Sequence, residues 1–190
     1  PNIPANKSNV WALSEGVAVF SNDLRDSIKG DVFEETDGAF IQGMNGQPQV
    51  KQTFYAANLA TAIQGNTKVA GQEGAERWAK SPRQVIAYAS VHDNLTLWDK
   101  LVATMQASAK ERNYEFDPEL LARNKLAAAI LFTSQGAVLT QAGEEFGRTK
   151  EGDENSFRSP LAVNQLDWAR AKTFKELREL YRGLWALRRS

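Results

Sequence analysis

The sequence predicts an α/β fold in which parallel strands are covered by helices, either in an open sheet or in a barrel. Three short, continuous apolar runs, residues 16–20, 85–89 and 137–140, have the length and composition of buried strands. Helical segments separate these runs, and such an alternation requires parallel strands buried on both faces. A polar stretch follows each predicted strand, and active sites of such folds are built there.

The first third of the chain contains one predicted strand and one predicted helix. The run 16–20 follows a segment with two prolines and no periodicity. A glycine-rich stretch at 30–46 has neither helical nor strand periodicity and predicts a long ordered loop. Residues 53–63 favour a short helix that ends near Gly65 and Asn66.

The middle third repeats this order with clearer boundaries. The run 85–89 predicts a strand that ends near the polar triplet 92–94. Thr96 together with Asp99 can cap a helix over about 97–107.

A further helix is predicted from Asp117–Pro118–Glu119 to about residue 133, with proline at a position that tolerates it. Residues 126–132 are apolar on all sides, so we expect this helix to be covered on more than one face.

The last part of the chain consists of a short strand, a polar loop and a helix. Gly136 ends the preceding helix, and residues 137–140 are the third strand candidate. A polar loop is expected to reach about residue 172. Thr173 and Glu176 have the spacing of a capping box for a final amphipathic helix.

Composition excludes several classes of function. Lys plus Arg and Asp plus Glu are equal at 23 each, so no global field favours nucleic acid, and no run is long enough to span a membrane. The absence of cysteine excludes disulfides and thiolate chemistry, and the compartment stays open between cytoplasm and exterior. Because the chain lacks an initiator Met and a signal-peptide pattern, we expect it to be processed or cut from a longer protein.

The triplet His92–Asp93–Asn94 is the first candidate site, because it follows a predicted buried strand. His92 is the only histidine, and a lone histidine is usually a structural, partly buried residue. Asp93 has the alternative role of a helix cap.

Two further polar groups follow the other strands. Asn22–Asp23 with Arg25–Asp26 comes after the first strand, and its alternative is an Asx-turn with an ion pair. Glu144 and Arg148 follow the third strand at a spacing of four, which is more often an ordinary ion pair. Residues 153–155 offer oxygens to a cation but lack the spacing of a calcium loop, so no metal site is predicted.

Four ordered blocks together resemble type I pullulanases, starch-debranching enzymes of the alpha-amylase superfamily. They are VAVFSNDLRDSIKG (17–30), YASVHDNLTLWD (88–99), GEEFGRTKEGDENSF (143–157) and NQLDW (164–168). The resemblance implies that residues 1–190 are the C-terminal part of a (β/α)8 catalytic barrel, with its sixth to eighth strands. It also implies retaining hydrolysis of α-1,6 branch linkages, with no cofactor and with no calcium ligand set identified here.

The resemblance assigns roles to individual residues. Asp93 would be the third catalytic carboxylate, while the nucleophilic Asp and the acid/base Glu would lie outside these 190 residues, leaving the segment inactive alone. His92 would bind the same sugar, and Asn94 would line the cleft beside it. Glu144 (or its neighbour Glu145) with Arg148 would hold the next glucose unit. Asn22 and Arg25 would line the cleft or serve as its scaffold. Phe20, Trp98 and Phe157 lie near these sites and could stack on sugar rings, although core packing is the commoner role of such aromatic residues.

The expected partners are an α-glucan and the remainder of the same catalytic domain, with no nucleic acid and no membrane. Two alternatives remain. One is an isoamylase or glycogen-debranching enzyme, which has a similar HDN triplet. The other is a non-catalytic α-glucan-binding protein that keeps the cleft without the chemistry.

Overall fold

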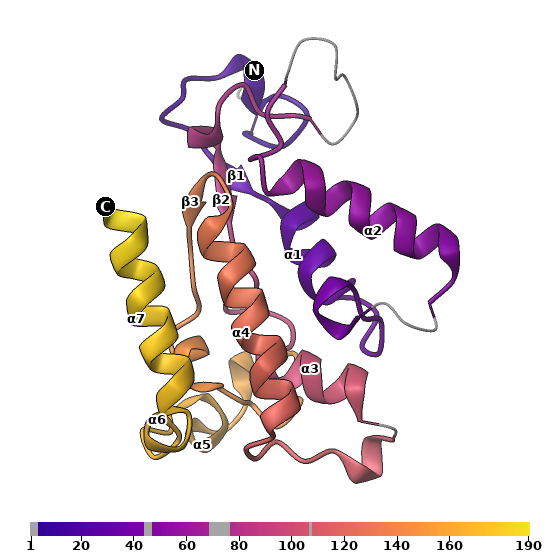
Figure 1. Cartoon of the computed structure of the whole chain (residues 1–190), viewed down its shortest axis with the longest axis vertical. Coiled ribbons are helices and arrows are strands. Elements are labelled where there is room, and N and C mark those ends of the chain that lie inside the picture. Colours follow the sequence, from indigo (N-terminus) through magenta and orange to yellow (C-terminus); the bar gives the residue numbers. More distant parts are fainter. Residues whose placement is uncertain (1–3, 44–46, 69–76, 107) are drawn as a thin grey trace.

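The structure is a computed structural model that describes residues 4–43, 47–68, 77–106 and 108–190. Its sheet has the strand order β1–β2–β3 (Figure 1). The strands are β1 (Val19–Phe20), β2 (Val85–Ala87) and β3 (Ala137–Val138). Both pairs are parallel: Phe20 lies opposite Ile86, and Ile86 lies opposite Ala137. The predicted α/β class with parallel strands is therefore confirmed.

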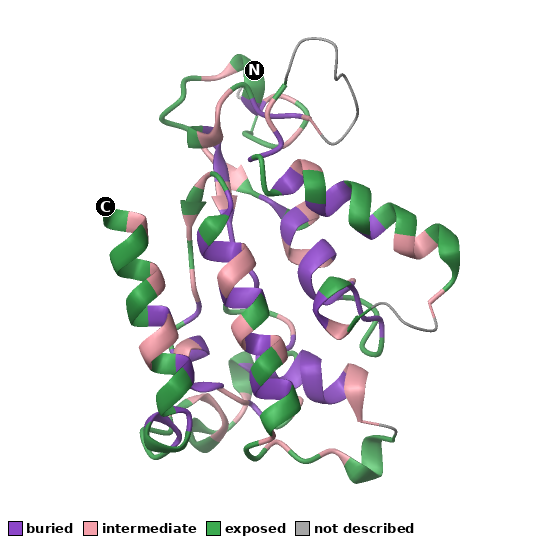
Figure 2. Ribbon diagram, viewed as in Figure 1, coloured by how far each residue is buried: buried purple, intermediate pink, exposed green. Residues whose placement is uncertain are grey.

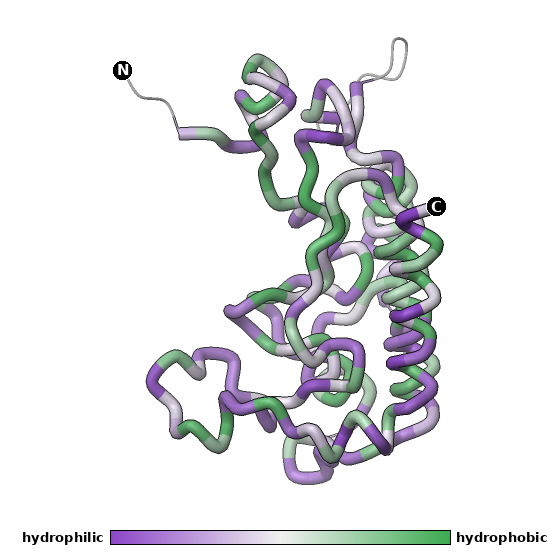
Figure 3. Tube along the Cα trace, turned by 90° about the vertical axis from the view of Figure 1, so that its left-hand side faces the viewer, coloured by the Kyte–Doolittle hydropathy of each residue, from purple (hydrophilic) through white to green (hydrophobic). Residues whose placement is uncertain are grey.

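Helical turns are stacked along the side of the molecule where the chain ends (Figure 3). The α-helices are α1 (Asn22–Lys29), α2 (Gln49–Ala62), α3 (Leu97–Met105), α4 (Pro118–Thr133), α5 (Leu161–Asn164), α6 (Arg170–Thr173) and α7 (Lys175–Arg189). Short 3-10 helices are Val10–Ala12, Phe40–Gln42, Pro82–Gln84, Ala109–Glu111, Glu144–Phe146 and Ser156–Arg158. Within the described ranges, no helix combines the length and the apolar character needed to cross a bilayer.

The strands are shorter and less buried than predicted. In the central strand β2, Val85 and Ala87 are fully buried. The outer strands β1 and β3 each pair on one side only, and Phe20 on β1 remains 45% exposed. The prediction of three strands buried on both faces is therefore wrong for β1 and β3, because Phe20 on β1 and Ala137 on β3 are exposed to solvent.

Helix α1 was not expected from the sequence, which suggested an Asx-turn at this position. The Ser21 hydroxyl accepts a hydrogen bond from the Leu24 amide at 3.2 Å and so caps the helix. Leu24 and Ile28 are four residues apart and fully buried, which gives α1 its inward face. The glycine-rich stretch that follows is irregular apart from Phe40–Gln42, and its end at 44–46 lies outside the described residues.

The predicted starts of α3 and α4 are confirmed by their caps. Thr96 Oγ1 accepts from the Asp99 amide at 3.1 Å, and Asp117 Oδ1 accepts from two amides of the first turn of α4. Figure 2 shows α3 buried along most of its length. Helix α4 leaves Leu126 exposed, but it packs against α7, α3 and α1, so the expected cover on more than one face is confirmed. Residue 107, the predicted end of α3, is not among the described residues.

The capping box predicted for the last helix is wrong. Thr173 ends the short helix α6, and α7 begins after Phe174 without a side-chain cap. Phe174 instead packs edge-to-face against Trp98, with ring centroids 4.8 Å apart, and this pair lies in the main core. Trp98 is thus a core residue. Helices α4 and α7 lie side by side (Figure 1) and close one end of that core.

Candidate functional site

The carboxyl ends of β1 and β2 open onto a hollow of about 790 Å³. Residues from β1, from the start of α1, from the segment after β2 and from the N-terminal segment surround it. They include Phe20, Asn22, Arg25, Tyr88, His92 and Asp93. Three of the six predicted site residues, Asn22, His92 and Asp93, therefore line one hollow, which is the position expected for an active site in a parallel α/β fold.

Tyr88 forms the wall between the two strand ends. Its hydroxyl donates to Asn22 Oδ1 at 2.7 Å and accepts from Arg25 Nη1 at 2.8 Å. The Phe20 ring packs edge-on against the Tyr88 ring, with centroids 5.0 Å apart. Burial raises the pKa of the Tyr88 phenol, against the opposing effect of Arg25. Tyr88 thus fixes Asn22 and offers an aromatic edge beside the hollow.

Arg25 belongs to the same wall. Its guanidinium contacts the Asp26 carboxylate through two bonds, from Nε at 2.6 Å and Nη2 at 3.1 Å. Burial raises the pKa of Asp26, although Arg25 acts in the opposite direction. The ion pair that the sequence suggested here is present. The neighbouring Asp23 is held by Lys7 and by Trp78 Nε1, so it supports the N-terminal segment and does not face a ligand.

Asp93 and His92 are both exposed at the rim of the hollow. Among the described residues, no hydrogen bond to the Asp93 carboxylate or to the His92 imidazole is formed. The helix-cap alternative for Asp93 is wrong, because Thr96 caps α3. His92 is not a buried structural histidine either. Asn94 adopts a left-handed backbone with φ of +60°, which turns the chain sharply after Asp93.

Glu144 does not line the hollow that holds Asp93. Its side chain is 2% exposed and accepts hydrogen bonds from Ser90 Oγ at 2.5 Å and from the Tyr181 hydroxyl at 2.8 Å. Burial raises the pKa of Glu144. The ordinary ion pair suggested for Glu144 and Arg148 is wrong, because Arg148 donates to the carbonyl oxygens of Ala142 and Asn164 instead. The hydroxyl groups of Ser90 and Tyr181 thus occupy one carboxylate oxygen of Glu144 each.

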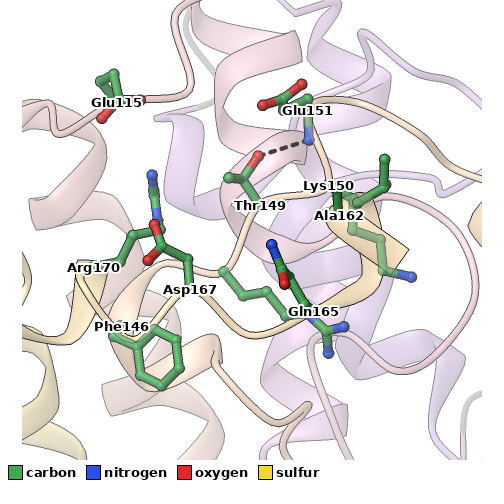
Figure 4. Close-up of a pocket in the computed structure, with 11 residues that line it drawn as sticks. Glu115, Phe146, Thr149, Lys150, Glu151, Ala162, Gln165, Asp167 and Arg170 are labelled. Atoms are coloured by element: carbon green, nitrogen blue, oxygen red, sulfur yellow. Dashed lines mark hydrogen bonds between the residues drawn. The ribbon is translucent and has the colours of Figure 1, made fainter. Parts of the chain in front are cut away.

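Arg148 lines a second, smaller hollow of about 260 Å³. Figure 4 shows this hollow, with Phe146, Asp167 and Arg170 among the labelled lining residues. Arg170 also lines it, with Nε donating to the Gly147 carbonyl at 2.9 Å and Nη2 to the Tyr114 carbonyl at 3.0 Å. Glu145 accepts from the Gly143 amide at 3.0 Å. Phe157 is strongly exposed beside Arg158. The structure thus separates Arg148 from the hollow that holds Asp93.

Sequence reasoning missed the role of Tyr88 and of Lys29. Lys29 ends α1, is 2% exposed and donates from Nζ to the Leu95 carbonyl at 3.3 Å. Burial lowers the pKa of Lys29 to about 7. The position of Tyr88 right after β2 was a usable signal, whereas no local pattern indicates that a terminal lysine of a polar helix is buried.

A parallel α/β fold with polar side chains in the loops after its strands has the arrangement in which the active sites of α/β enzymes are built. No family model matches the chain. The chain is similar to the pullulanase of Bacillus subtilis (strain 168), with 34% identity over 175 residues, 92% of this chain and 22% of the relative. Pullulanase A of Streptococcus pneumoniae is 33% identical over 154 residues, 80% of this chain and 11% of the relative.

Two solved pullulanase structures are also similar to this chain. The pullulanase of Paenibacillus barengoltzii in complex with maltohexaose and alpha-cyclodextrin matches with a TM-score of 0.79 and 35% identity, over 97% of this chain and 26% of that one. The type I pullulanase of Bacillus subtilis complexed with maltose matches with a TM-score of 0.76 and 34% identity, over 91% of this chain and 22% of that one. The resemblance to pullulanases is confirmed. The chain spans about a quarter or less of the length of these relatives.

Proposed function

We propose that residues 1–190 are the C-terminal part of a (β/α)8 catalytic domain that hydrolyses α-1,6 branch linkages in pullulan, amylopectin and related α-glucans. Homology to pullulanases over most of the chain supports this proposal, as does the parallel order of β1, β2 and β3. In this proposal the three strands are the sixth to eighth of the barrel. The free outer edges of β1 and β3 are where the remaining strands of the domain would pair.

The observation that carries the proposal is the position of Asp93. Its carboxylate is exposed in the segment after the buried strand β2, accepts no hydrogen bond from the described residues, and lies beside a hollow with aromatic and polar walls. A carboxylate that binds sugar hydroxyls helps to distort the ring and favours the positive charge of an oxocarbenium-like transition state. His92 offers a ring nitrogen to the same sugar, and Asn22 and Asn94 provide amide groups near it.

The rest of the chemistry is assigned to the remainder of the domain. Retaining hydrolysis needs a nucleophilic carboxylate and an acid/base carboxylate about 5 to 5.5 Å apart. We assign the nucleophile Asp and the acid/base Glu to the part of the relatives that this chain does not span, so the segment alone is inactive. Arg148 is assigned to a neighbouring glucose unit through the second hollow. The direct sugar contact expected of Glu144 is not supported by its burial.

The test is Asp93→Asn in the full-length protein that contains this segment, assayed on pullulan. We expect kcat to fall far more than KM changes, because the carboxylate acts mainly on the transition state. Glu119→Gln, which removes an exposed carboxylate from α4, is the matched control and should keep full activity. Near-normal kcat in Asp93→Asn would remove Asp93 from the catalytic machinery.

His92→Ala should raise KM and also lower kcat. A loss confined to the melting temperature would instead make His92 structural. Product analysis on pullulan and on glycogen separates a pullulanase from an isoamylase or glycogen-debranching enzyme. A protein that binds both glucans and hydrolyses neither would be a non-catalytic α-glucan-binding protein.

A further inference from the structure

The polar network around Glu144 is buried and lies apart from the proposed sugar-binding hollow. Ser90, Glu144 and Tyr181 are each at most 3% exposed, and the carboxylate accepts one bond from each hydroxyl. Ser90 lies in the segment after β2, Glu144 begins the 3-10 helix after β3, and Tyr181 is on α7. The carboxylate thus joins three elements that are distant in sequence.

Lys29 brings a fourth element, α1, to the same region. Its ammonium group donates to the Leu95 carbonyl at 3.3 Å and interacts electrostatically with Glu144. Both charges are unfavourable where they lie, because burial lowers the pKa of Lys29 to about 7 and raises that of Glu144. Apolar side chains of similar size often give equal or greater stability at such positions. Stability alone is therefore a poor explanation for these two charges.

The anchoring points bracket the candidate catalytic segment. Ser90 immediately precedes residues 91–94, and Leu95 immediately follows them. A third contact, from Lys150 Nζ to the His92 carbonyl at 3.4 Å, holds the middle of the segment. The segment is thus attached to buried groups at both ends, while Asp93 projects outward.

We propose that Glu144 and Lys29 are positioning residues that fix the 91–94 segment, and through it the Asp93 carboxylate, against the sugar. The proposal rests on the proposed function of Asp93. It replaces direct sugar binding by Glu144 with an action through the backbone on either side of Asp93. A misplacement of about 1 Å in a catalytic group can cost about 100-fold in rate.

The experiment is a double-mutant cycle in the full-length protein, with pullulan as the substrate. Lys29→Met and Ser90→Ala each remove one anchoring hydrogen bond. Each substitution is made both in the parent protein and in the Asp93→Asn variant. We expect each anchor variant to lower kcat about 10- to 100-fold with KM changed less than about 3-fold. In the Asp93→Asn background the same changes should have little further effect, because they act through that carboxylate.

Lys100→Met is the matched control, because it replaces another buried lysine that donates to a different loop. It should lose stability and keep kcat. Unchanged kcat in Lys29→Met and Ser90→Ala, or full additivity with Asp93→Asn, would overturn the positioning role. If Lys29→Met does not fold, Ser90→Ala decides the question. A parent protein without pullulan hydrolysis, or an Asp93→Asn variant with normal kcat, would refute the proposed function instead.

Discussion

Lys100→Met tests how one buried lysine organises an irregular loop. Lys100 is 1% exposed, and its Nζ donates to the carbonyl oxygens of Asp31 at 2.8 Å, Glu34 at 2.6 Å and Glu35 at 3.2 Å. Bonds from a charged donor contribute roughly 1.5 to 3 kcal/mol each. Because Glu34 and Glu35 are exposed residues, their carbonyl groups can regain water in the variant. We therefore expect a net loss of about 2 to 4 kcal/mol in the free energy of unfolding, less than three full bonds.

The assay is denaturant unfolding of the full-length protein, combined with limited proteolysis of the loop around residues 31–35. Lys100→Met should unfold at lower denaturant concentration and be cut faster in this loop. Lys175→Met, on the exposed side of α7, is the control and should stay within about 0.5 kcal/mol of the parent. Equal stability and equal cleavage of Lys100→Met and the parent would refute the role of Lys100 in holding the loop.

Three further predictions concern stability, each measured by unfolding of variant and parent. The pKa of Lys29 falls from 10.5 to about 7 on folding, so the unfolded chain binds more protons between these values. The stability of the parent relative to Lys29→Met should therefore rise with pH across that window, by up to about 1.4 kcal/mol per pH unit; a flat difference contradicts the burial of this charge. Gly30→Ala should destabilise strongly, because the glycine has φ of +91° and a Cβ would lie 2.1 Å from a backbone oxygen. Gly183→Ala, in open space on α7, should instead stabilise by roughly 0.5 to 1 kcal/mol, and equal effects of the two glycine changes would refute this. Asp117→Ala should lower the free energy of unfolding by about 1 kcal/mol, because it removes the side-chain cap of α4. Asp117→Asn should keep most of the parent's stability, because asparagine also caps helices.

Local patterns were enough to predict the central part of the fold. The apolar run around β2, the Thr96 cap and the Asp117–Pro118 helix start depend on neighbouring residues, and the structure contains all three. The exposed position of Asp93 after β2 followed from the same reasoning. Helix α1 was missed because its dense polar residues also suit a turn, and only two of its buried residues, Leu24 and Ile28, are apolar.

The burial of charged groups could not be predicted locally. Glu144 has its partners 54 and 37 residues away, and Lys29 has its acceptor 66 residues away. Whether such a side chain faces solvent or protein depends on how distant elements pack. The sequence therefore indicated a polar group after β3, but not that Glu144 faces Ser90 and Tyr181 rather than a ligand.

The contact between Glu144 and Tyr181 also has a consequence for the order of events during synthesis. Asp93 leaves the ribosome before α7, the helix that completes its anchoring network, and α7 ends 96 residues after Asp93. At a synthesis rate of roughly 5 to 20 residues per second, on the order of 5 to 20 s pass between the synthesis of the segment around Asp93 and the completion of α7, which carries Tyr181. We expect nascent chains that stop before α7 to leave Glu144 without the Tyr181 hydroxyl and to remain open to chaperones and proteases during that interval.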